Sequence, residues 1–372
     1  MIKLSKLPMF FLGALSKDGF SSDFCNVYDA YDGWNVYILK GGPGTGKSTL
    51  MKSLAAEAVK NKCEVLLCPC SSDPNSLDAV ILPNMKCVVM DGTAPHVVEP
   101  QFPIVCEQII NLGECANSKV LQARRAEVLT LCEEKTAYTN RAKRYISAAA
   151  ELLADAYKTQ WFCTDMQKVE RTAHRLVKEY ITASGQKKGK RLGCRLRAIT
   201  PLGMMYHKST PQKLCTNTIV IADEYGAAAN RLLSVIENEA INSGCDVITA
   251  VDPIFHDMRI DAVMLPQQQI AFCCENRYMH PNTENRRIHS RRFTDVKALQ
   301  LHRARLSFDK KTADDMLREA AASMAIASEI HSKIEKYYVN VMDFSRISQI
   351  SQNLNESIFT KKNNNNKSID KT

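Results

Sequence analysis

The sequence G-G-P-G-T-G-K-S, Gly41 to Ser48, follows directly on the apolar run V-Y-I-L of residues 36–39. It has the G-x4-G-K-S pattern of a phosphate-binding loop, placed as expected between a strand and a helix. The glycines allow the backbone to turn tightly and to direct its N–H groups toward an anion. The helix that follows from Thr49 presents its positive end to the same phosphates. The loop therefore predicts a nucleotide-binding α/β protein.

Each part of the loop has an expected role. The Lys47 ammonium reaches the β- and γ-phosphates, and the Ser48 hydroxyl ligates Mg²⁺. ATP is the expected nucleotide because no N-K-x-D guanine signature follows a later strand, and without an L-S-G-G-Q run an ABC-type ATPase is not favoured. The residues expected to bind ATP are Gly41, Gly42, Pro43, Gly44, Thr45, Gly46, Lys47, Ser48 and Thr49.

A second metal-binding group is expected at the end of the run K-C-V-V-M-D, residues 86–91. A P-loop enzyme needs a carboxylate near its Mg²⁺, and the carboxyl end of a buried parallel strand opens on the nucleotide crevice. Asp91 is therefore the predicted Mg²⁺ residue beside Ser48. The alternative is that Asp91 only begins a D-G turn.

The general base is not defined by the sequence. Gly92 stands where many ATPases carry a Glu next to Asp91, so the base comes from elsewhere or the reaction is not hydrolysis. Asp73 and His96 both follow predicted strands, and a histidine with a pKa near 6.5 can act as a base at neutral pH. The alternatives are a turn-forming Asp73 and a structural His96. The candidate catalytic residues are Lys47, Asp91, Asp73 and His96.

The chain contains an internal duplication. C-E-V-L-L at residues 63–67 corresponds to C-D-V-I-T at 245–249, and L-D-A-V-I-L-P at 77–83 corresponds to I-D-A-V-M-L-P at 260–266. The spacing between the two matches is nearly the same in both halves. We therefore expect two similar modules, each with a strand, a loop and a helix followed by further strands.

The second copy of the phosphate loop lacks the residues that bind phosphate and metal. In the register of the duplication, Asp223 replaces the first glycine, Ala229 the lysine and Asn230 the metal-binding serine, while Cys274 replaces the metal carboxylate. Asp223 and Glu224 also bring negative charge to the place of the phosphates, where like charges about 4 Å apart repel by about 4 kcal/mol at an effective dielectric of about 20. We expect this module to be a degenerate copy.

Two long regions have apolar residues at helical spacing. They cover residues 119–181, with a short stretch at 108–112, and residues 297–342. We expect each to form an antiparallel helical hairpin, and K-T-A recurs within them at Lys135 and Lys311. Packing between the halves and contact with a protein partner are both open for these regions.

These patterns predict an α/β protein built from two tandem P-loop NTPase modules with helical hairpin insertions. The predicted segments are a P-loop module at 1–184, a degenerate module at 192–345 and a disordered tail at 361–372.

The composition is that of a globular protein rather than a membrane or nucleic-acid-binding one. The 372 residues are 45% hydrophobic and 24% charged. No apolar run approaches the length of a membrane span, which is about 20 residues.

No secretion signal is recognised, so we expect a cytoplasmic protein with reduced cysteines. Cys68-Pro-Cys70 is too tight for a C-x-x-C pair and has no second pair, which disfavours structural zinc. The net charge of +9 includes basic clusters without interleaved aromatics, so nucleic acid is not the expected partner.

Three runs carry a resemblance to a known family: I-L-K-G-G-P-G-T-G-K-S-T-L-M-K, C-S-S-D-P-N-S-L-D-A-V-I-L-P and M-D-G-T-A-P-H-V-V-E-P. The chain resembles, over nearly its whole length, an uncharacterised bacterial family of tandem P-loop ATPases. The resemblance implies two fused P-loop modules, ATP binding by residues 41–49 and Asp91 on the metal. Family members often keep a loop in both halves, and this chain departs from them in the second. The resemblance implies no substrate.

Three functions are compatible with these residues. The first is an ATPase that hydrolyses the β-γ phosphoanhydride and switches the helical arms. The second is a nucleotide or small-molecule kinase, and the third a non-hydrolysing ATP sensor. The missing Glu after Asp91 weighs against fast hydrolysis, and the lack of an Arg-rich lid weighs against a nucleotide kinase. Arg197 or Arg231 from the second half is a candidate arginine finger.

Overall fold

The computed structural model describes residues 4–185, 187–255, 258–282 and 286–369, with side chains described as far as residue 360. The chain forms two compact units. Unit 1 consists of Met1–Leu7, Val27–Ala137 and Ala327–Thr372, and unit 2 of Pro8–Asn26 and Tyr138–Ile326.

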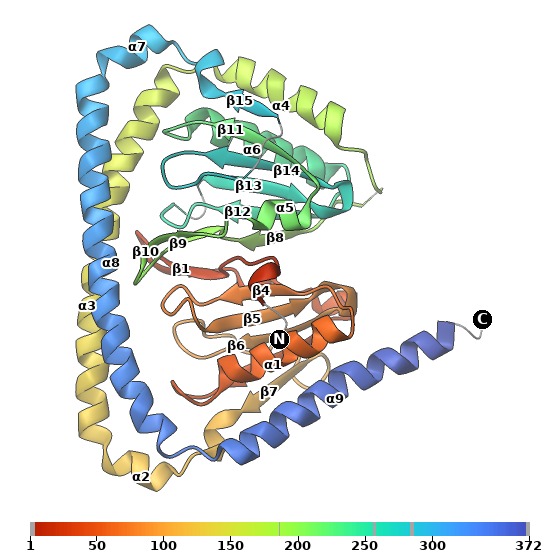
Figure 1. The fold of residues 1–372 in the computed structure, drawn as a ribbon. Helices are drawn as coiled ribbons and strands as arrows, with labels where there is room; N and C mark the ends of the chain where they lie inside the picture. The colour runs from red at the N-terminus through yellow and green to blue at the C-terminus, as the bar shows by residue number, and fades with distance from the viewer. Residues whose placement is uncertain (1–3, 186, 256–257, 283–285, 370–372) are drawn as a thin grey trace. The chain divides into compact units, whose positions relative to one another are not determined.

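Unit 1 contains a five-stranded sheet in the order β4-β5-β6-β3-β7 (Figure 1). β3 is parallel to β6 and β7, while β5 is antiparallel to both β4 and β6. The interior of β3 is buried at every position, as expected for a continuous apolar run in a strand covered on both faces. The strands are β3 (Asn35–Lys40), β4 (Leu66–Pro69), β5 (Leu77–Leu82), β6 (Cys87–Asp91) and β7 (Glu107–Asn111).

Helix α1 (Lys47–Lys60) follows β3 and packs on β5 and β6. Its buried residues recur three and four positions apart, which gives it one apolar face toward the sheet. Helix α9 (Phe344–Ile369) contacts α1, and the short helix α2 (Ser118–Ala123) precedes the first long helix of the chain.

The helix expected at residues 108–112 is instead strand β7 and the first residue of a 3-10 turn. Ile109 and Ile110 are in parallel register with Ile38 and Leu39 of β3, so this segment completes one edge of the sheet. A run of five residues is too short for its apolar spacing to distinguish a strand from a helix.

Unit 2 contains a six-stranded sheet in the order β15-β11-β14-β13-β12-β8. Apart from β8, this is the order of unit 1 when β11 to β15 take the places of β3 to β7. β11 is again parallel to both of its neighbours, and β13 is again antiparallel to both of its own. The strands are β8 (Arg191–Cys194), β11 (Asn217–Ala222), β12 (Val247–Val251), β13 (Ile260–Leu265), β14 (Ile270–Glu275) and β15 (Arg287–His289).

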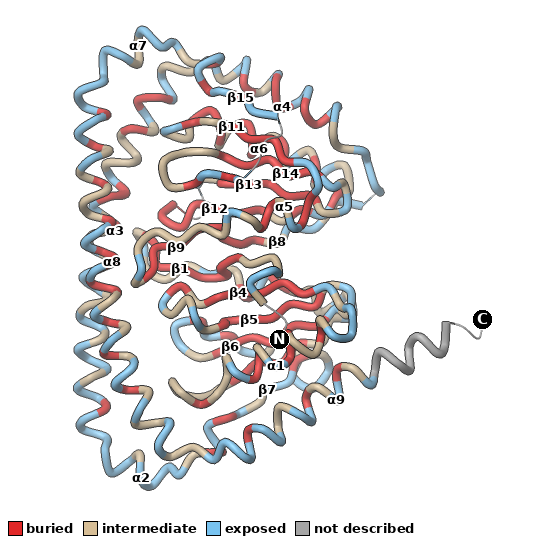
Figure 2. The backbone as a smooth tube through the Cα atoms, in the orientation of Figure 1, coloured by how far each residue is buried: buried red, intermediate tan, exposed pale blue. Residues whose placement is uncertain are grey.

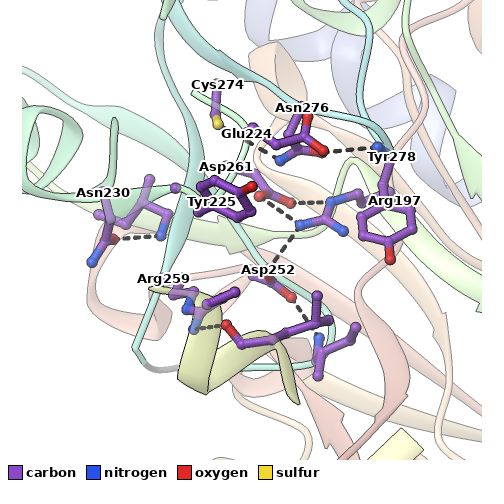
Figure 3. A pocket seen from close by; sticks show the side chains of 15 residues that line it. Arg197, Glu224, Tyr225, Asn230, Asp252, Arg259, Asp261, Cys274, Asn276 and Tyr278 are labelled. Carbon is purple, nitrogen blue, oxygen red and sulfur yellow. Dashed lines mark hydrogen bonds and ion pairs between the residues drawn. The ribbon is translucent and has the colours of Figure 1, made fainter. Parts of the chain in front are cut away.

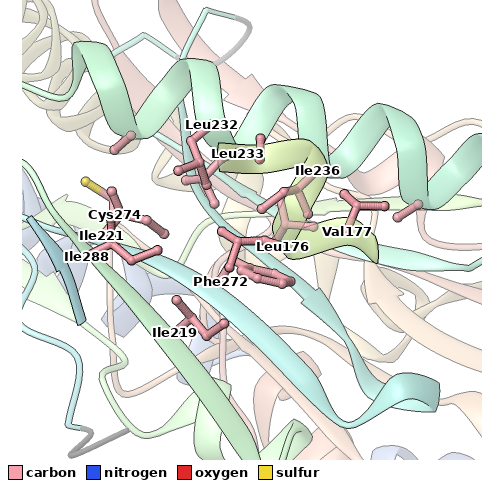
Figure 4. Packing of buried hydrophobic residues seen from close by; sticks show 14 of the residues in the cluster. Leu176, Val177, Ile219, Ile221, Leu232, Leu233, Ile236, Phe272, Cys274 and Ile288 are labelled. Atoms are coloured by element: carbon pink, nitrogen blue, oxygen red, sulfur yellow. The ribbon is translucent and has the colours of Figure 1, made fainter. Parts of the chain in front are cut away.

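Two helices cover one face of the unit 2 sheet. α6 (Ala227–Asn242) and α4 (Met166–Tyr180) pack on each other and share an apolar cluster with the strands. Figure 4 shows Leu232, Leu233 and Ile236 of α6 near Leu176 of α4 and Phe272 of β14. Figure 2 shows buried residues concentrated on the strands of each sheet.

The remaining elements are short. Unit 2 also has the hairpins β1 (Gly13–Ser16) with β2 (Gly19–Ser22) and β9 (Arg197–Thr200) with β10 (Gly203–Tyr206), and the helices α5 (Thr210–Leu214) and α7 (Val296–Leu301). The 3-10 helices are η1 (Leu4–Lys6), η2 (Phe24–Asn26), η3 (Ala30–Asp32), η4 (Pro83–Met85), η5 (Leu112–Cys115), η6 (Pro266–Gln268) and η7 (Ser290–Arg292). Within the described ranges, none of the helices has the length and apolarity that crossing a bilayer requires.

The two long helices pack on each other rather than folding back as separate hairpins. α3 (Arg125–Phe162) and α8 (Arg303–Val339) each contribute residues to both units. In unit 2, Ile146 and Ala149 of α3 share an apolar cluster with Leu317 and Ala320 of α8. α4 meanwhile packs on α6. The hairpin expected for each region is therefore wrong, because the apolar residues of the two long helices share one cluster, to which Leu15 and Ile199 also belong.

The compact units follow this packing and not the limits of the repeated sequence. Residues 138–184 of the predicted first segment lie in unit 2, and residues 327–345 of the second lie in unit 1. α9 extends to Ile369, into the segment 361–372 that was expected to be a disordered tail. Residues 370–372 lie outside the described residues.

Unit 2 has a buried ion-pair network around Arg197 in β9. The guanidinium donates to Asp261 through Nε at 2.7 Å and to Asp252 through Nη2 at 2.9 Å. All three side chains are nearly inaccessible to solvent. Burial raises the pKa of Asp261, and the Arg197 charge opposes this shift. Arg197 thus bridges two buried carboxylates, and the charge of Arg259 also favours the ionised form of Asp261.

We expect Arg197→Met to destabilise the protein by about 3–5 kcal/mol, because it leaves two buried carboxylates without their cation. Urea unfolding measures the change. The matched control is Arg231→Met, which removes the partly exposed ion pair with Glu170 and is expected to cost about 0–1 kcal/mol. A loss for Arg197→Met no larger than that of the control would contradict this assignment.

Candidate functional site

The phosphate loop of unit 1 connects the carboxyl end of β3 to α1. Gly44 and Gly46 have φ angles of 72° and 85°, in the left-handed region that favours glycine. The Thr45 hydroxyl is buried in the loop and donates to the Gly42 carbonyl at 2.8 Å. Gly46 is the N-cap of α1 and has no side chain to accept from the first-turn N–H groups. Such a helix start is suited to an anion.

Lys47 lies across the loop. Its Nζ donates to the carbonyls of Gly41 at 2.6 Å and Gly42 at 2.8 Å, and it is 3.6 Å from Asp91 Oδ2. The side chains of Lys47 and Asp91 are only 11% and 16% exposed. The structure therefore brings together a lysine and a carboxylate that lie 44 positions apart in the sequence.

Asp91 both forms a turn and faces the loop. β6 is in register with β3, so that Asp91 lies beside Leu39. Its Oδ1 accepts from the N–H of Thr93 at 2.8 Å, and the Thr93 hydroxyl donates to the Gly41 carbonyl at 3.1 Å. The two interpretations of Asp91 offered by the sequence are thus compatible, since one oxygen closes the turn and the other faces Lys47.

The residues present fit a Mg²⁺ ion. Ser48 is in the first turn of α1, and its Oγ accepts from the N–H of Leu77 at 3.0 Å. Ser48 at the start of α1 offers a hydroxyl and Asp91 at the end of β6 a carboxylate oxygen, and Mg²⁺ prefers such hard oxygen ligands together with nucleotide phosphates.

Two basic residues near this site were missed by the sequence analysis. Lys135 of α3 has its Nζ 3.0 Å from His331 Nδ1 of α8. Burial, with the charges of Lys135 and Lys47, lowers the pKa of His331 to about 4, against the opposing charge of Asp73. Burial also lowers the pKa of Lys135. His331 thus lies within electrostatic range of Lys47, and Lys135 lies beside His331.

The phosphate loop is in contact with α8. A Cβ added at Gly42 would collide with the ring of Tyr338, and one at Gly44 would lie 2.7 Å from Glu335 Cγ and 2.8 Å from Val339 Cγ2. The glycines are therefore required for close packing as well as for the turn. The loop thus packs directly against the end of α8.

The other two candidate catalytic residues have structural partners. Asp73 accepts from the Ser76 hydroxyl at 2.5 Å and from the N–H of Asn75 at 3.2 Å, as a turn-forming residue does. His96 is buried, with its Nε2 3.4 Å from Asp78 Oδ1. Asp73 influences the pKa of His331 and so lies within electrostatic range of the basic cluster, whereas His96 faces Asp78.

The equivalent loop of unit 2 contains a carboxylate of the protein itself. α6 begins after Gly226, which has a left-handed φ of 84° like Gly46. Asp223 is buried, and its Oδ2 accepts from the N–H of Ala229 at 2.9 Å. Gln160 donates to the same carboxylate and accepts from the N–H of Ala227 at 2.9 Å. The start of α6 thus has an internal anion.

Little space remains beside this second loop. Figure 3 shows a pocket lined by Glu224, Tyr225 and the Arg197 network, with a cavity of about 50 Å³. That volume holds a few waters, whereas small-molecule sites occupy about 300–1,000 Å³. Both arginines considered as fingers have partners inside unit 2, since Arg197 bonds to two aspartates and Arg231 Nε donates to Glu170 at 2.8 Å.

We expect His331 to make the protein acid-sensitive. Between about pH 6.5 and pH 4 the imidazole is protonated in the unfolded chain and neutral in the fold, so stability present above about pH 6.5 is lost as the pH falls. Thermal unfolding of His331→Gln should therefore show a smaller drop between about pH 7 and pH 5 than the original protein. The exposed His302→Gln is the control, and equal drops in all three proteins would contradict the assignment.

One known protein family is similar to the segment that contains the phosphate loop. A family model described as Novel STAND NTPase 3 matches residues 21–93, a segment that contains β3, the phosphate loop, α1 and Asp91. No curated protein and no solved structure matches the chain significantly. The segment that carries the candidate site is therefore similar to a STAND-type, P-loop NTPase-like family, and nucleotide binding is the function this similarity supports.

Proposed function

We propose that the protein binds Mg·ATP in the phosphate loop of unit 1 and hydrolyses the β-γ phosphoanhydride. The observation that carries the proposal is the position of the Lys47 ammonium, held by loop carbonyls and 3.6 Å from Asp91 at the adjacent strand end. A triphosphate would replace those carbonyls as the partner of Lys47. Catalysis of phosphoryl transfer rests chiefly on such positioned charge.

The metal would be held by Ser48 and Asp91. Mg²⁺ supplies charge neutralisation on the β- and γ-phosphates when bound. Asp91 also orients the Thr93 N–H and faces Lys47, so a single carboxylate organises the turn, the lysine and the metal side of the site.

Unit 2 is a degenerate, pseudo-active module in this proposal. The sequence register, the shared strand order and the left-handed glycine before α6 support descent from a common P-loop module. Asp223 and Gln160 occupy the N–H groups that a phosphate would need. Unit 2 therefore does not bind a triphosphate and serves as a structural partner.

Lys135 and His331 connect the bound nucleotide with the long helices. They lie on α3 and α8, near Lys47, and α8 also packs on Gly42 through Tyr338. A γ-phosphate would attract the Lys135 ammonium beside His331, and its loss would release that contact. The protein would thus act as a cytoplasmic ATP-driven switch whose helices convey the nucleotide state to a protein partner.

A non-hydrolysing ATP sensor is the second candidate function. Gly92 offers no carboxylate next to Asp91, and Asp73 is engaged in its own turn by Ser76 and Asn75. A site that binds and positions the phosphates without a base for water would sense ATP rather than consume it.

The loop lysine tests the binding site. We expect Lys47→Ala to weaken Mg·ATP binding by about 10- to 100-fold, because a charge-assisted hydrogen bond is lost. Calorimetry measures the affinity. Ala229→Lys in unit 2 is the matched variant and should add no second site, since Asp223 still fills that loop. Unchanged affinity in Lys47→Ala, or a second equivalent of ATP bound by Ala229→Lys, would refute the assignment.

An assay of phosphate and ADP formation distinguishes the ATPase, the kinase and the ATP sensor. Mg-dependent release of phosphate without an added acceptor supports the ATPase. ADP formation only when a nucleotide or metabolite acceptor is present supports a kinase, and tight ATP binding with neither product supports the sensor.

The helical basic residues should distinguish ATP from ADP. We expect Lys135→Ala to weaken ATP binding by about tenfold and ADP binding much less, because only ATP carries the γ-phosphate. Calorimetry with both nucleotides gives the ratio of affinities. The exposed Lys119→Ala of α2 is the control. An unchanged ratio in Lys135→Ala would show that Lys135 does not contact the γ-phosphate.

A further inference from the structure

Three metal-ligating side chains of unit 1 converge outside the phosphate loop. Cys70 follows β4, Asp78 is the second residue of β5, and His96 lies in the segment after β6. One ligand atom from each lies within 4.8 Å of the other two, and His96 Nε2 is 3.4 Å from Asp78 Oδ1. Three separate chain segments therefore bring a thiol, a carboxylate and an imidazole to one point.

Asp78 and His96 are buried and Cys70 is partly buried, and one Asp78 oxygen lacks a hydrogen-bond partner among the described residues. Asp78 is 3% exposed and His96 7%. Asp78 Oδ2 has no hydrogen-bond partner among the described residues. A buried carboxylate oxygen without a donor of its own is costly, so a cation at this point would stabilise Asp78.

In unit 2, the positions that correspond to Cys70 and Asp78 are both occupied by carboxylates. Asp252 directly follows β12, as Cys70 follows β4, and Asp261 is the second residue of β13, as Asp78 is of β5. Both strand pairs have an irregularity in register at this end. In unit 2 the two carboxylates are bridged by the guanidinium of Arg197. A buried cation is thus part of this structural position.

We propose that Cys70, Asp78 and His96 bind a zinc ion in unit 1. Thiolate, imidazole and carboxylate are all established zinc ligands, and a site with three protein ligands leaves a fourth position for water or another ligand. Bond lengths of about 2.0–2.3 Å place tetrahedral ligand atoms about 3.3–3.8 Å apart, so the cluster needs only a small contraction. The thiolate distinguishes this site from a Mg²⁺ site, which takes oxygen ligands.

The same three residue types also form thiol-nucleophile triads, but the environment of Cys70 does not suit a nucleophile. A reactive cysteine lies in an electropositive environment, whereas the Cys70 thiol lies beside the Asp78 carboxylate. Lys135 also lies within electrostatic range of Cys70. Zinc would provide the stronger stabilisation, because a bound metal deprotonates its thiol ligand.

Metal binding can be tested on the intact protein without nucleotide. After removal of metals with a chelator, titration with Zn²⁺ against a chromophoric competitor should show one tight equivalent. Co²⁺ in its place should give the intense visible bands of a tetrahedral site and a near-ultraviolet thiolate charge-transfer band. Cys70→Ala should abolish the charge-transfer band, and Asp78→Asn or His96→Gln should weaken Zn²⁺ binding by at least about tenfold.

Two controls locate the site. Cys63→Ala removes another thiol of unit 1 and should leave the Zn²⁺ equivalent and the Co²⁺ spectrum unchanged. Lys47→Ala should also retain zinc, so that failure of the nucleotide proposal does not affect this one. The proposal is overturned if the original protein binds no tight Zn²⁺ equivalent. It is equally overturned if its Co²⁺ complex lacks the thiolate band, or if Cys63→Ala and Cys70→Ala lose zinc alike.

Discussion

The two units are organised around the same requirement, an acceptor for the N–H groups at the start of one helix. α1 and α6 each begin after a left-handed glycine at the end of a buried strand, and a helix start of this kind requires an acceptor. In unit 2 the acceptor is the Asp223 carboxylate, one residue after β11. In unit 1 the same position is Gly41, and a lysine lies across the loop instead. The residue at this one position thus distinguishes the two modules. With Asp223 the N–H groups of the helix start have an acceptor within the protein, and with Gly41 they are suited to a phosphate.

The local features of this arrangement could be predicted from the sequence. A continuous apolar run predicts the buried strand β3, and the G-x4-G-K-S spacing predicts the turn and the start of α1. The partners of the long helices could not be predicted in this way. Periodicity shows which face of α3 or α8 is apolar, but not which helix covers it. The strand at 108–112 was misjudged for a related reason, since five residues contain too little of either period.

The candidate site could be predicted from the sequence where its side chains lie at or just after the end of a strand. Lys47 and Asp91 meet because β3 and β6 are adjacent and in register. Lys135 and His331 could not be placed, because they are 196 positions apart and meet only through the packing of α3 with α8. The recurring K-T-A at Lys135 was the one available signal. For His96 the sequence indicated the residue but not its partner, since Asp78 lies inside a strand that otherwise reads as apolar.

The phosphate loop and the Cys70 cluster share the same backbone. Leu77 donates its N–H to Ser48, the predicted Mg²⁺ ligand, and the next residue is Asp78. On the other side, Lys40 immediately precedes the loop and donates to the carbonyls of Gly92 and Val98, which flank His96. A cation bound between Asp78 and His96 would therefore restrain β5 and the segment after β6 together. Because Leu77 of β5 donates to the Ser48 hydroxyl, we propose that the order of the nucleotide site depends on how the buried charge of Asp78 is balanced.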